Sequence, residues 1–217
     1  MSKRLDAISR DIRACRICRD SPQKQRLTHE PRPVFRVSAT ASIGVFSQAP
    51  GARVHASGVP FTDPSGVRLR RWMGITDDEF YDGSRVCVVP MGFCFPGYDS
   101  KGADRPPRSE CAPLWRERLL SELPALKLVL LVGSYSQRWH LKSEYGESLS
   151  ATVANWSEIT QIKNRPGGVR FWPLPHPSWR NNAWLAKNPW FGDELLPELR
   201  ADVKAALSRH AVLLKAG

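Results

Sequence analysis

The amino-acid sequence predicts an α/β fold, a three-layer α/β/α sandwich around a central four-stranded parallel sheet. Two observations carry this prediction. Short apolar segments alternate with helical segments along the chain, as they do in parallel sheets that helices cover on both sides. Residues 126–132 (LKLVLLV) form an almost continuous apolar run, which is typical of a strand buried on both faces.

The N-terminal segment, residues 1–36, is basic and is expected to pack on the rest of the domain. Residues 3–19 read as a basic helix that ends in a CxxC pair. Residues 20–36 contain three prolines and are predicted to form an extended connection.

The remaining elements follow from the alternation of apolar runs and turn residues. Each predicted strand ends in a loop rich in proline, glycine or serine, and Pro64-Ser65-Gly66 is predicted to open the first helix of the sandwich. Strands are predicted at residues 41–46, 84–90, 126–132 and 169–174, and helices at 67–73, 109–123, 134–141, 184–187 and 197–214. Three conspicuous loops lie at the carboxyl ends of strands, where parallel sheets place their sites, at residues 47–66, 91–107 and 175–184.

The length of 217 residues fits one domain spanning residues 1–217. Hydrophobic residues make up 41% of the chain, so wholesale disorder is excluded. No apolar stretch approaches the roughly 20 residues of a membrane span, and the N-terminus lacks the apolar core of a secretory signal. We expect a monomer of the cytoplasm, associated with the nucleoid, without a membrane partner.

The formal net charge of +11 indicates a polyanionic partner, and DNA is the first candidate. Residues 1–36 alone hold ten Lys and Arg against four Asp and Glu. The alternative is a solvated basic surface without a partner. The eight tryptophans are consistent with a DNA partner, because an indole ring can stack on a base as well as pack in a core.

The five cysteines are not expected to form disulfides in a cytoplasmic protein. Cys15 and Cys18 form a CxxC pair, which can bind one metal ion or cluster when two further thiols complete the site. Cys94 and Cys111 are available for this. Cys87 lies in the middle of a predicted strand and is expected in the core.

The loop after the first strand reads SQAPGARVHASGVPFTDPSG. Ala49-Pro50-Gly51 turns the backbone sharply, which leaves amides free for a phosphate or a planar heterocycle. Phe61 is an aromatic residue on a glycine-flanked loop, suited either to stacking on a base or to packing under the loop. Asp63 precedes Pro-Ser-Gly, a position typical of a helix N-cap.

The loop after the last strand holds His176 between two prolines. Because both prolines restrict the backbone, the imidazole is held in place, which favours a functional role over a structural one. Ser178 can donate to a phosphate, and Trp179 and Arg180 can enter a duplex.

These two loops resemble the uracil-DNA glycosylase superfamily, and most closely its iron–sulfur branch, the family 4 type. The segments SQAPG and GVPFTDPSG are similar to the first motif of that branch, and His176-Pro177-Ser178 is similar to its second. Four cysteines follow in the order of the branch. The resemblance covers nearly the whole chain.

The resemblance implies a monofunctional DNA glycosylase of base excision repair, which hydrolyses the N-glycosidic bond of uracil or a related deaminated base. His176 would hydrogen-bond the base, and Phe61 would stack on it after it has left the DNA stack. The other implied base-binding positions are Ala49, Pro50, Gly51, Pro90 and Met91. The implied DNA contacts are Ser178, Trp179, Arg180 and Asn181, with Arg180 the first and Trp179 the second candidate for the wedge.

A [4Fe–4S] cluster on Cys15, Cys18, Cys94 and Cys111 is implied by the same resemblance, in a structural rather than a redox role. Zinc on the same four cysteines is the alternative. No lysine in the two motifs offers a Schiff base, so strand cleavage by β-elimination is not expected.

The sequence departs from the branch at three positions. Gln48 stands where the branch has glutamate, and glutamine can position a water but cannot act as a base. Asp63, where the branch has glycine, is then the candidate carboxylate. Pro90 replaces the asparagine that reads uracil, which leaves backbone groups of Met91 and Gly92 for recognition and admits other bases.

Two other functions remain open. A non-catalytic DNA- or lesion-binding protein of the same fold is favoured by the missing acid and the missing asparagine. A zinc-bearing nucleic-acid-binding protein unrelated to repair would be colourless and would lack a pocket aromatic.

Overall fold

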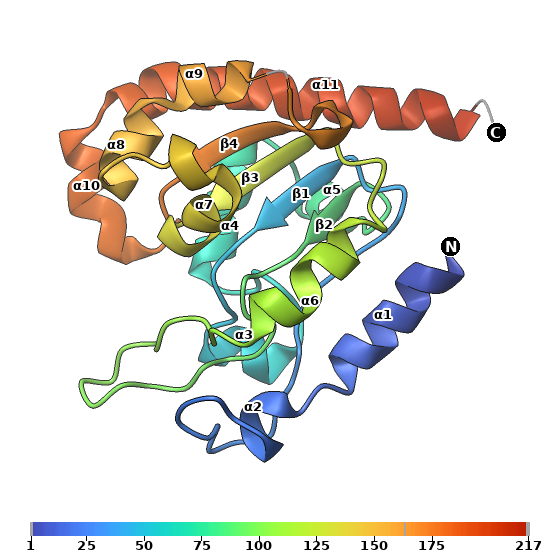
Figure 1. Ribbon diagram of the computed structural model, residues 1–217. Helices are drawn as coiled ribbons and strands as arrows, with labels where there is room; N and C mark the ends of the chain where they lie inside the picture. Colours follow the sequence, from blue (N-terminus) through green and yellow to red (C-terminus); the bar gives the residue numbers. More distant parts are fainter. Residues whose placement is uncertain (1, 163, 216–217) are drawn as a thin grey trace.

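The protein is described by a computed structural model that covers residues 2–162 and 164–215 (Figure 1). Its centre is a sheet of the strands β1 (Ile43–Phe46), β2 (Val86–Val88), β3 (Leu128–Val132) and β4 (Arg170–Leu174). The strand order is β2-β1-β3-β4, and every neighbouring pair is parallel. The predicted four-stranded parallel sheet is therefore confirmed.

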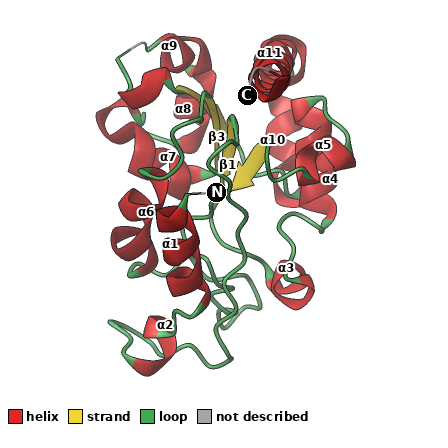
Figure 2. Ribbon diagram, turned by 90° about the vertical axis from the view of Figure 1, so that its right-hand side faces the viewer, coloured by secondary structure: helices red, strands yellow, loops and turns green. Residues whose placement is uncertain are grey.

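Helices cover both faces of this sheet (Figure 2). One side carries α4, α5, α10 and α11, and the other carries α1, α6, α7 and α9. The helices in the described residues are α1 (Lys3–Arg13), α2 (Ile17–Asp20), α3 (Ala52–Ser57), α4 (Pro64–Met73), α5 (Asp77–Tyr81), α6 (Cys111–Leu120), α7 (Ser134–Leu141), α8 (Leu149–Ala154), α9 (Trp156–Gln161), α10 (Asn182–Lys187) and α11 (Leu196–Lys215).

Two hydrophobic clusters, one on each face of the sheet, hold the three layers together. Val45 of β1 belongs to the cluster that includes Leu69 of α4, whereas the next residue, Phe46, belongs to the cluster that includes Leu119 of α6. Successive strand residues point to opposite faces, so a strand between two helix layers needs apolar residues at every position. Each fully buried large side chain contributes roughly 1.5–3 kcal/mol to this packing.

The N-terminal helix differs from the prediction. The expected helix over residues 3–19 is broken, because α1 ends at Arg13 and α2 begins at Ile17. At the break the Cys15 N–H donates to the Ile12 carbonyl, a tighter turn than that of an α-helix. The turn places both cysteines of the CxxC pair on the lining of one cavity.

Several short helices were not predicted, namely α3, α5, α8 and α9. Two of them, α5 and α8, have a side-chain cap at their first turn. Thr76 and Glu79 form a capping box at the start of α5, and the Ser148 hydroxyl caps α8 by accepting from the Ala151 N–H. No helix in the described part of the chain is long and apolar enough to cross a membrane.

Candidate active site and cysteine cavity

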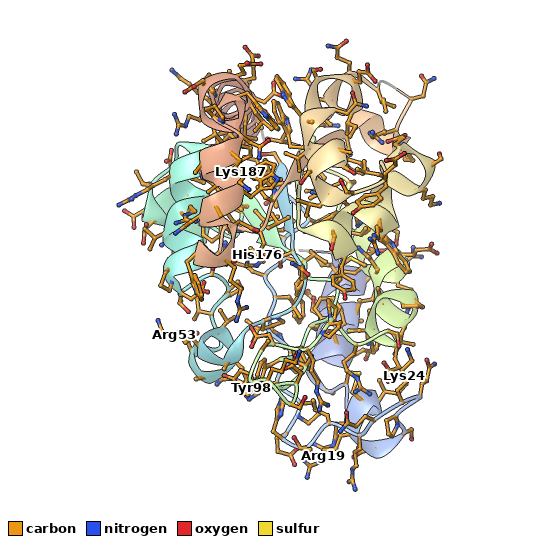
Figure 3. The ribbon with its side chains drawn as sticks, turned by 90° about the vertical axis from the view of Figure 1, so that its left-hand side faces the viewer. Arg19, Lys24, Arg53, Tyr98, His176 and Lys187 are labelled. Atoms are coloured by element: carbon orange, nitrogen blue, oxygen red, sulfur yellow. The ribbon has the colours of Figure 1, made fainter. Side chains whose placement is uncertain are left out.

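A cleft of about 800 Å³ opens where the strands end, within the size range of small-ligand sites. Its lining comes from the three loops that the sequence singles out, after β1, β2 and β4, and from the first turn of α7. Figure 3 views this side of the molecule, with His176 above Tyr98 and Arg53. All but one of the predicted catalytic, base-binding and DNA-binding residues line this one cleft, namely Gln48, Ala49, Pro50, Gly51, Phe61, Asp63, Pro90, His176, Ser178, Trp179, Arg180 and Asn181.

The exception is Met91. The loops after β1 and β2 are tied together at their base, where the Met91 N–H donates to the Ser47 carbonyl (2.9 Å) and the Gly92 N–H donates to the Gln48 carbonyl (2.9 Å). Met91 itself is buried and does not line the cleft. The expectation that these two amides recognise a base is therefore corrected, because both are already paired within the protein. Pro90 does reach the cleft.

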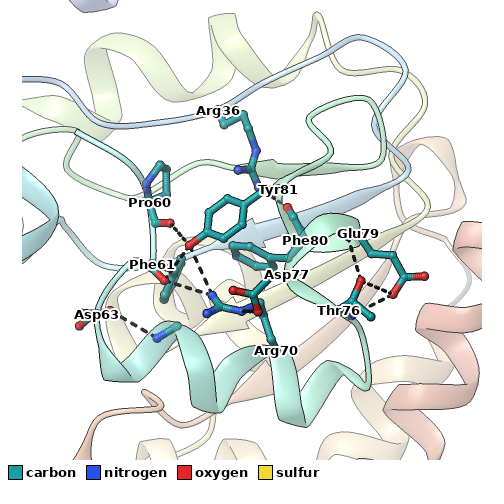
Figure 4. A network of polar contacts seen from close by, with 11 residues as sticks. Arg36, Pro60, Phe61, Asp63, Arg70, Thr76, Asp77, Glu79, Phe80 and Tyr81 are labelled. Carbon is teal, nitrogen blue, oxygen red and sulfur yellow. Dashed lines mark hydrogen bonds and ion pairs between the residues drawn. The ribbon is translucent and has the colours of Figure 1, made fainter. Parts of the chain in front are cut away.

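Phe61 forms part of the cleft wall in a strained but well-supported conformation (Figure 4). Its φ of 57° lies in the left-handed region, which costs a non-glycine residue roughly 1–2 kcal/mol. The Phe61 carbonyl accepts from the Tyr81 hydroxyl (3.1 Å) and the buried Arg70 guanidinium (3.2 Å), and the ring meets Phe80 edge-on. A Cβ at Gly66 would lie 1.7 Å from that carbonyl, so the glycine of the PSG segment is required by this close approach.

His176 follows the end of β4 at the cleft floor. The Asn181 side-chain amide donates to the His176 carbonyl (2.7 Å) and so fixes the loop. Burial lowers the pKa of the imidazole, while the charge of Asp63 raises it and the charge of Arg180 lowers it further. The ring is therefore neutral at pH 7 and can donate one N–H to a bound group.

Two carboxylates line the cleft. Asp63 caps α4, because its side chain accepts from the Gly66 N–H (3.3 Å), and its charge also acts on His176. Asp104 was not predicted; its carboxylate lies 3.4 Å from where a Cβ of Gly51 would be. Burial raises the pKa of Asp104, Arg180 lowers it and Asp63 raises it, so these charges share one site.

Sequence reasoning also missed Arg68, Tyr98, Arg105 and Tyr135, all of which line the cleft. Arg68 donates to the Ser178 carbonyl (3.1 Å) and ties α4 to the His-Pro-Ser loop. No motif marks these residues, and only the meeting of strand ends identifies them. Several prolines also line the cleft, among them Pro90, Pro96, Pro106 and Pro107, and a proline has no backbone N–H to offer a ligand.

Gln48 lies against Gly133, the residue that links β3 to α7. A Cβ at Gly133 would stand 2.5 Å from the Gln48 Nε2, and Gly133 has a φ of 85°. We expect Gly133→Ala to destabilise the protein by about 1–2 kcal/mol through backbone strain and to displace Gln48 as well. Gly97→Ala is the matched control, because Gly97 has a φ of 87° and no atom within 4 Å of the added Cβ.

Urea unfolding, together with the base-release activity that the resemblance implies, separates the two effects of this substitution. Both variants should lose stability, and only Gly133→Ala should also lower activity at a temperature where each is folded. Equal activity of the two would show that the position of Gln48 does not matter.

Stability should fall on the acid side of neutrality because partial burial lowers the pKa of His140 and of His176. Burial is the largest cause of a lowered pKa in both, so between their folded pKa and about 6.5 the unfolded chain binds more protons than the native protein. The free energy of unfolding is therefore expected to decrease as the pH falls below 6.5, by up to about 1.4 kcal/mol per pH unit for each histidine. Urea titrations at pH 7.5 and 5.5 measure this; equal midpoints would contradict it.

Cys15, Cys18, Cys94 and Cys111 line a second cavity, at the junction of the N-terminal segment, the loop after β2 and the start of α6. The Phe93 N–H donates to the Cys111 sulfur (3.4 Å), and burial raises the pKa of the Cys94 and Cys111 thiols to about 12. Cys87 lies buried in β2, as expected.

The lining of this cavity offers thiols, which are ligands of both iron–sulfur clusters and structural zinc. Four free thiols and no other metal-binding side chain are the ligands that a [4Fe–4S] cluster takes. Tetrahedral zinc would need its sulfurs about 2.3 Å from one ion. Within the described residues, no group of three or more Cys, His, Asp or Glu side chains is arranged so that it could hold a metal ion.

Polar contacts of Arg108, a residue of the cavity lining, connect the segments beside the cavity. Arg108 pairs with the buried Glu110 (2.8 Å), and Glu110 also accepts from the Gln23 N–H (3.3 Å). Arg108 donates further to the Gln25 carbonyl. The segment after the CxxC pair is thereby attached to the start of α6.

The family model described as the uracil DNA glycosylase superfamily matches residues 35–200 of the chain. The match covers the sheet, the cleft and two of the four cavity cysteines. Cys15 and Cys18 precede it.

Proposed function

Since the chain belongs to the uracil-DNA glycosylase superfamily, we propose that it is a monofunctional DNA glycosylase for uracil or a related deaminated base. The observation that carries this proposal is that one cleft receives Phe61 and Asp63 from the loop after β1 and a neutral His176 from the loop after β4. These are an aromatic face for the base, a carboxylate and a hydrogen-bond donor.

The reaction breaks the bond between the sugar C1′ and the base nitrogen. The sugar becomes cation-like and the base leaves as an anion, so groups that favour these charges lower the barrier. His176 donates an N–H to a carbonyl oxygen of the base, where negative charge develops. Its neutral form suffices for this, and the lowered pKa of His176 keeps that form at pH 7.

Asp63 is the proposed carboxylate that faces the developing cation, and Gln48 is proposed to hold the attacking water. Both line the cleft with Phe61, whose ring stacks on the base. Water adds to C1′, its proton passes to solvent or to a carboxylate, and the base takes up a proton after it leaves. An abasic site remains in the DNA.

Asp63→Asn is expected to lower base release by about 10²-fold or more while the protein stays folded. Asparagine caps a helix about as well as aspartate, so the substitution removes the charge and keeps the cap. Asp104→Asn is the comparison, since it removes a charge from the same cleft without touching α4. Single-turnover rates with a uracil-containing strand distinguish the two; a larger loss for Asp104 would reassign the role.

We propose further that Cys15, Cys18, Cys94 and Cys111 hold a [4Fe–4S] cluster. The four free thiols around one cavity support this, and the order of the cysteines resembles the iron–sulfur branch. Such a cluster supplies cross-linking of segments distant in sequence. Arg108, which lines the cavity and is held by its ion pair with Glu110, would lie beside it.

The test is base release from oligonucleotides that carry uracil, xanthine or hypoxanthine at one position, followed by alkali to reveal abasic sites. The proposal is supported if any of these strands is cleaved and if Asp63→Asn loses that cleavage. The base that is released fastest is then the one for which the cleft is specific. The alternative is a DNA-binding protein of the same fold without catalysis, which Gln48 and Ala49 favour because neither can ionise. Binding without release from any substrate would establish that alternative.

A further inference from the structure

Exposed aromatic side chains gather at the mouth of the cleft. In the described part of the chain, five large hydrophobic side chains are strongly exposed, and three of them are aromatic: Tyr98 (51%), Tyr135 (41%) and Trp179 (73%). All three aromatic residues line the cleft, whereas the exposed Val59 and Val67 do not. Exposed aromatic surface that is concentrated in one place marks a binding site.

These rings come from segments that follow three different strands. Tyr98 lies in the loop after β2, Tyr135 in the first turn of α7 after β3, and Trp179 in the loop after β4. Tyr98 is braced from behind, because Phe95 meets its ring edge-on at 5.0 Å and His29 stacks on Phe95 at 5.4 Å. A supported ring with an open face is suited to receive another planar group.

Cations accompany the aromatic rings. The cleft lining includes four arginines and two aspartates, and Arg180 lies next to Trp179, with its guanidinium 5.8 Å from the ring centre. In Figure 3 Tyr98 and Arg53 lie on the same side of His176. A basic groove with aromatic rings is the arrangement by which proteins hold single strands, because arginine follows the phosphates and each ring stacks on a base.

We propose that the mouth of this cleft binds single-stranded DNA, with unpaired bases on either side of the target stacked on Tyr98, Tyr135 and Trp179. The inference rests on the proposed function and names the form of its substrate. The bases of a duplex are stacked on one another, so a duplex offers room for one protein ring, inserted as a wedge. Three open rings after three strands of the sheet match a single strand, whose neighbouring bases are free to stack on them.

The experiment measures binding apart from catalysis. The full-length protein is titrated against a labelled 15-nucleotide strand without any damaged base, and against the same strand annealed to its complement, with fluorescence anisotropy as the readout. We expect tighter binding of the single strand. Tyr98→Leu, Tyr135→Leu and Trp179→Leu should each weaken single-strand binding about tenfold and leave duplex binding almost unchanged.

Two further variants make the result specific. Tyr98→Phe restores a ring without the hydroxyl and should regain the affinity that Tyr98→Leu loses. Val67→Ala alters an exposed residue outside the cleft and should bind as the unmodified protein does. Equal or tighter binding of the duplex, or an equal loss on both forms in the leucine variants, would overturn the proposal. Because the strand carries no damaged base, a failure of base release leaves this result unaffected.

Discussion

Replacing His176 with alanine is expected to lower the rate of base release by about 10²–10³-fold, the loss typical of one donor removed from a developing anion. The imidazole is held by the Asn181 contact to its backbone and is neutral because burial lowers its pKa. It therefore acts as a donor without needing a charge. The measurement is single-turnover release from a uracil-containing strand.

A second variant separates donation from simple packing at this position. His176→Gln keeps a side-chain N–H and should recover part of the activity that alanine loses. DNA affinity and the unfolding midpoint are measured alongside. If alanine and glutamine are equally active, or if alanine retains full activity, His176 is not the donor.

Removing a cavity cysteine is expected to have the largest effect on the protein itself. Cys94→Ala should abolish bound iron and the visible absorption of the cluster, because three thiolates do not complete its coordination. Metal-binding energy is folding energy in such sites. A loss of about 3 kcal/mol would lower the Tm by about 6–12 °C.

Cys87→Ala is the matched control, since Cys87 is buried in β2 and does not line the cavity. Cys87→Ala should lower the stability slightly, through lost packing in the core, and should leave the metal content unchanged. Iron and zinc are both measured in the purified protein. Zinc in place of iron would replace the cluster by the alternative assignment, and no metal in the unmodified protein would refute both.

The sheet was predictable because its signal is strong and local. A strand between two helix layers must be apolar throughout, so residues 126–132 identify β3 without further information. The short helices gave no such signal. Thr76 and Glu79 do form a capping box that the sequence displays, but five-residue α5 is stable only because Phe80 packs in the core.

The site was predictable where a motif carries it and not elsewhere. Phe61 and His176 lie in two recognisable loops, and both line the cleft. Tyr98, Asp104 and Tyr135 lie in segments without a motif, and they reach the cleft only because neighbouring strands end together. The prediction that Met91 binds the base was wrong for a related reason. Its amide continues the hydrogen bonding between β1 and β2 beyond the ends of the strands.

The two hydrogen bonds that the Phe61 carbonyl accepts, from Tyr81 and Arg70, also affect how the protein discriminates among bases by size. Because Tyr81 and Arg70 fix this backbone from the core, the stacking face is set when the domain folds and does not adapt to its ligand. Any allowance for a purine must then come from the rest of the cleft lining, where Pro90 and its proline neighbours offer shape but no amide donors. The proline-rich part of the lining therefore acts on the choice of base through shape, beside the hydrogen bond proposed for His176.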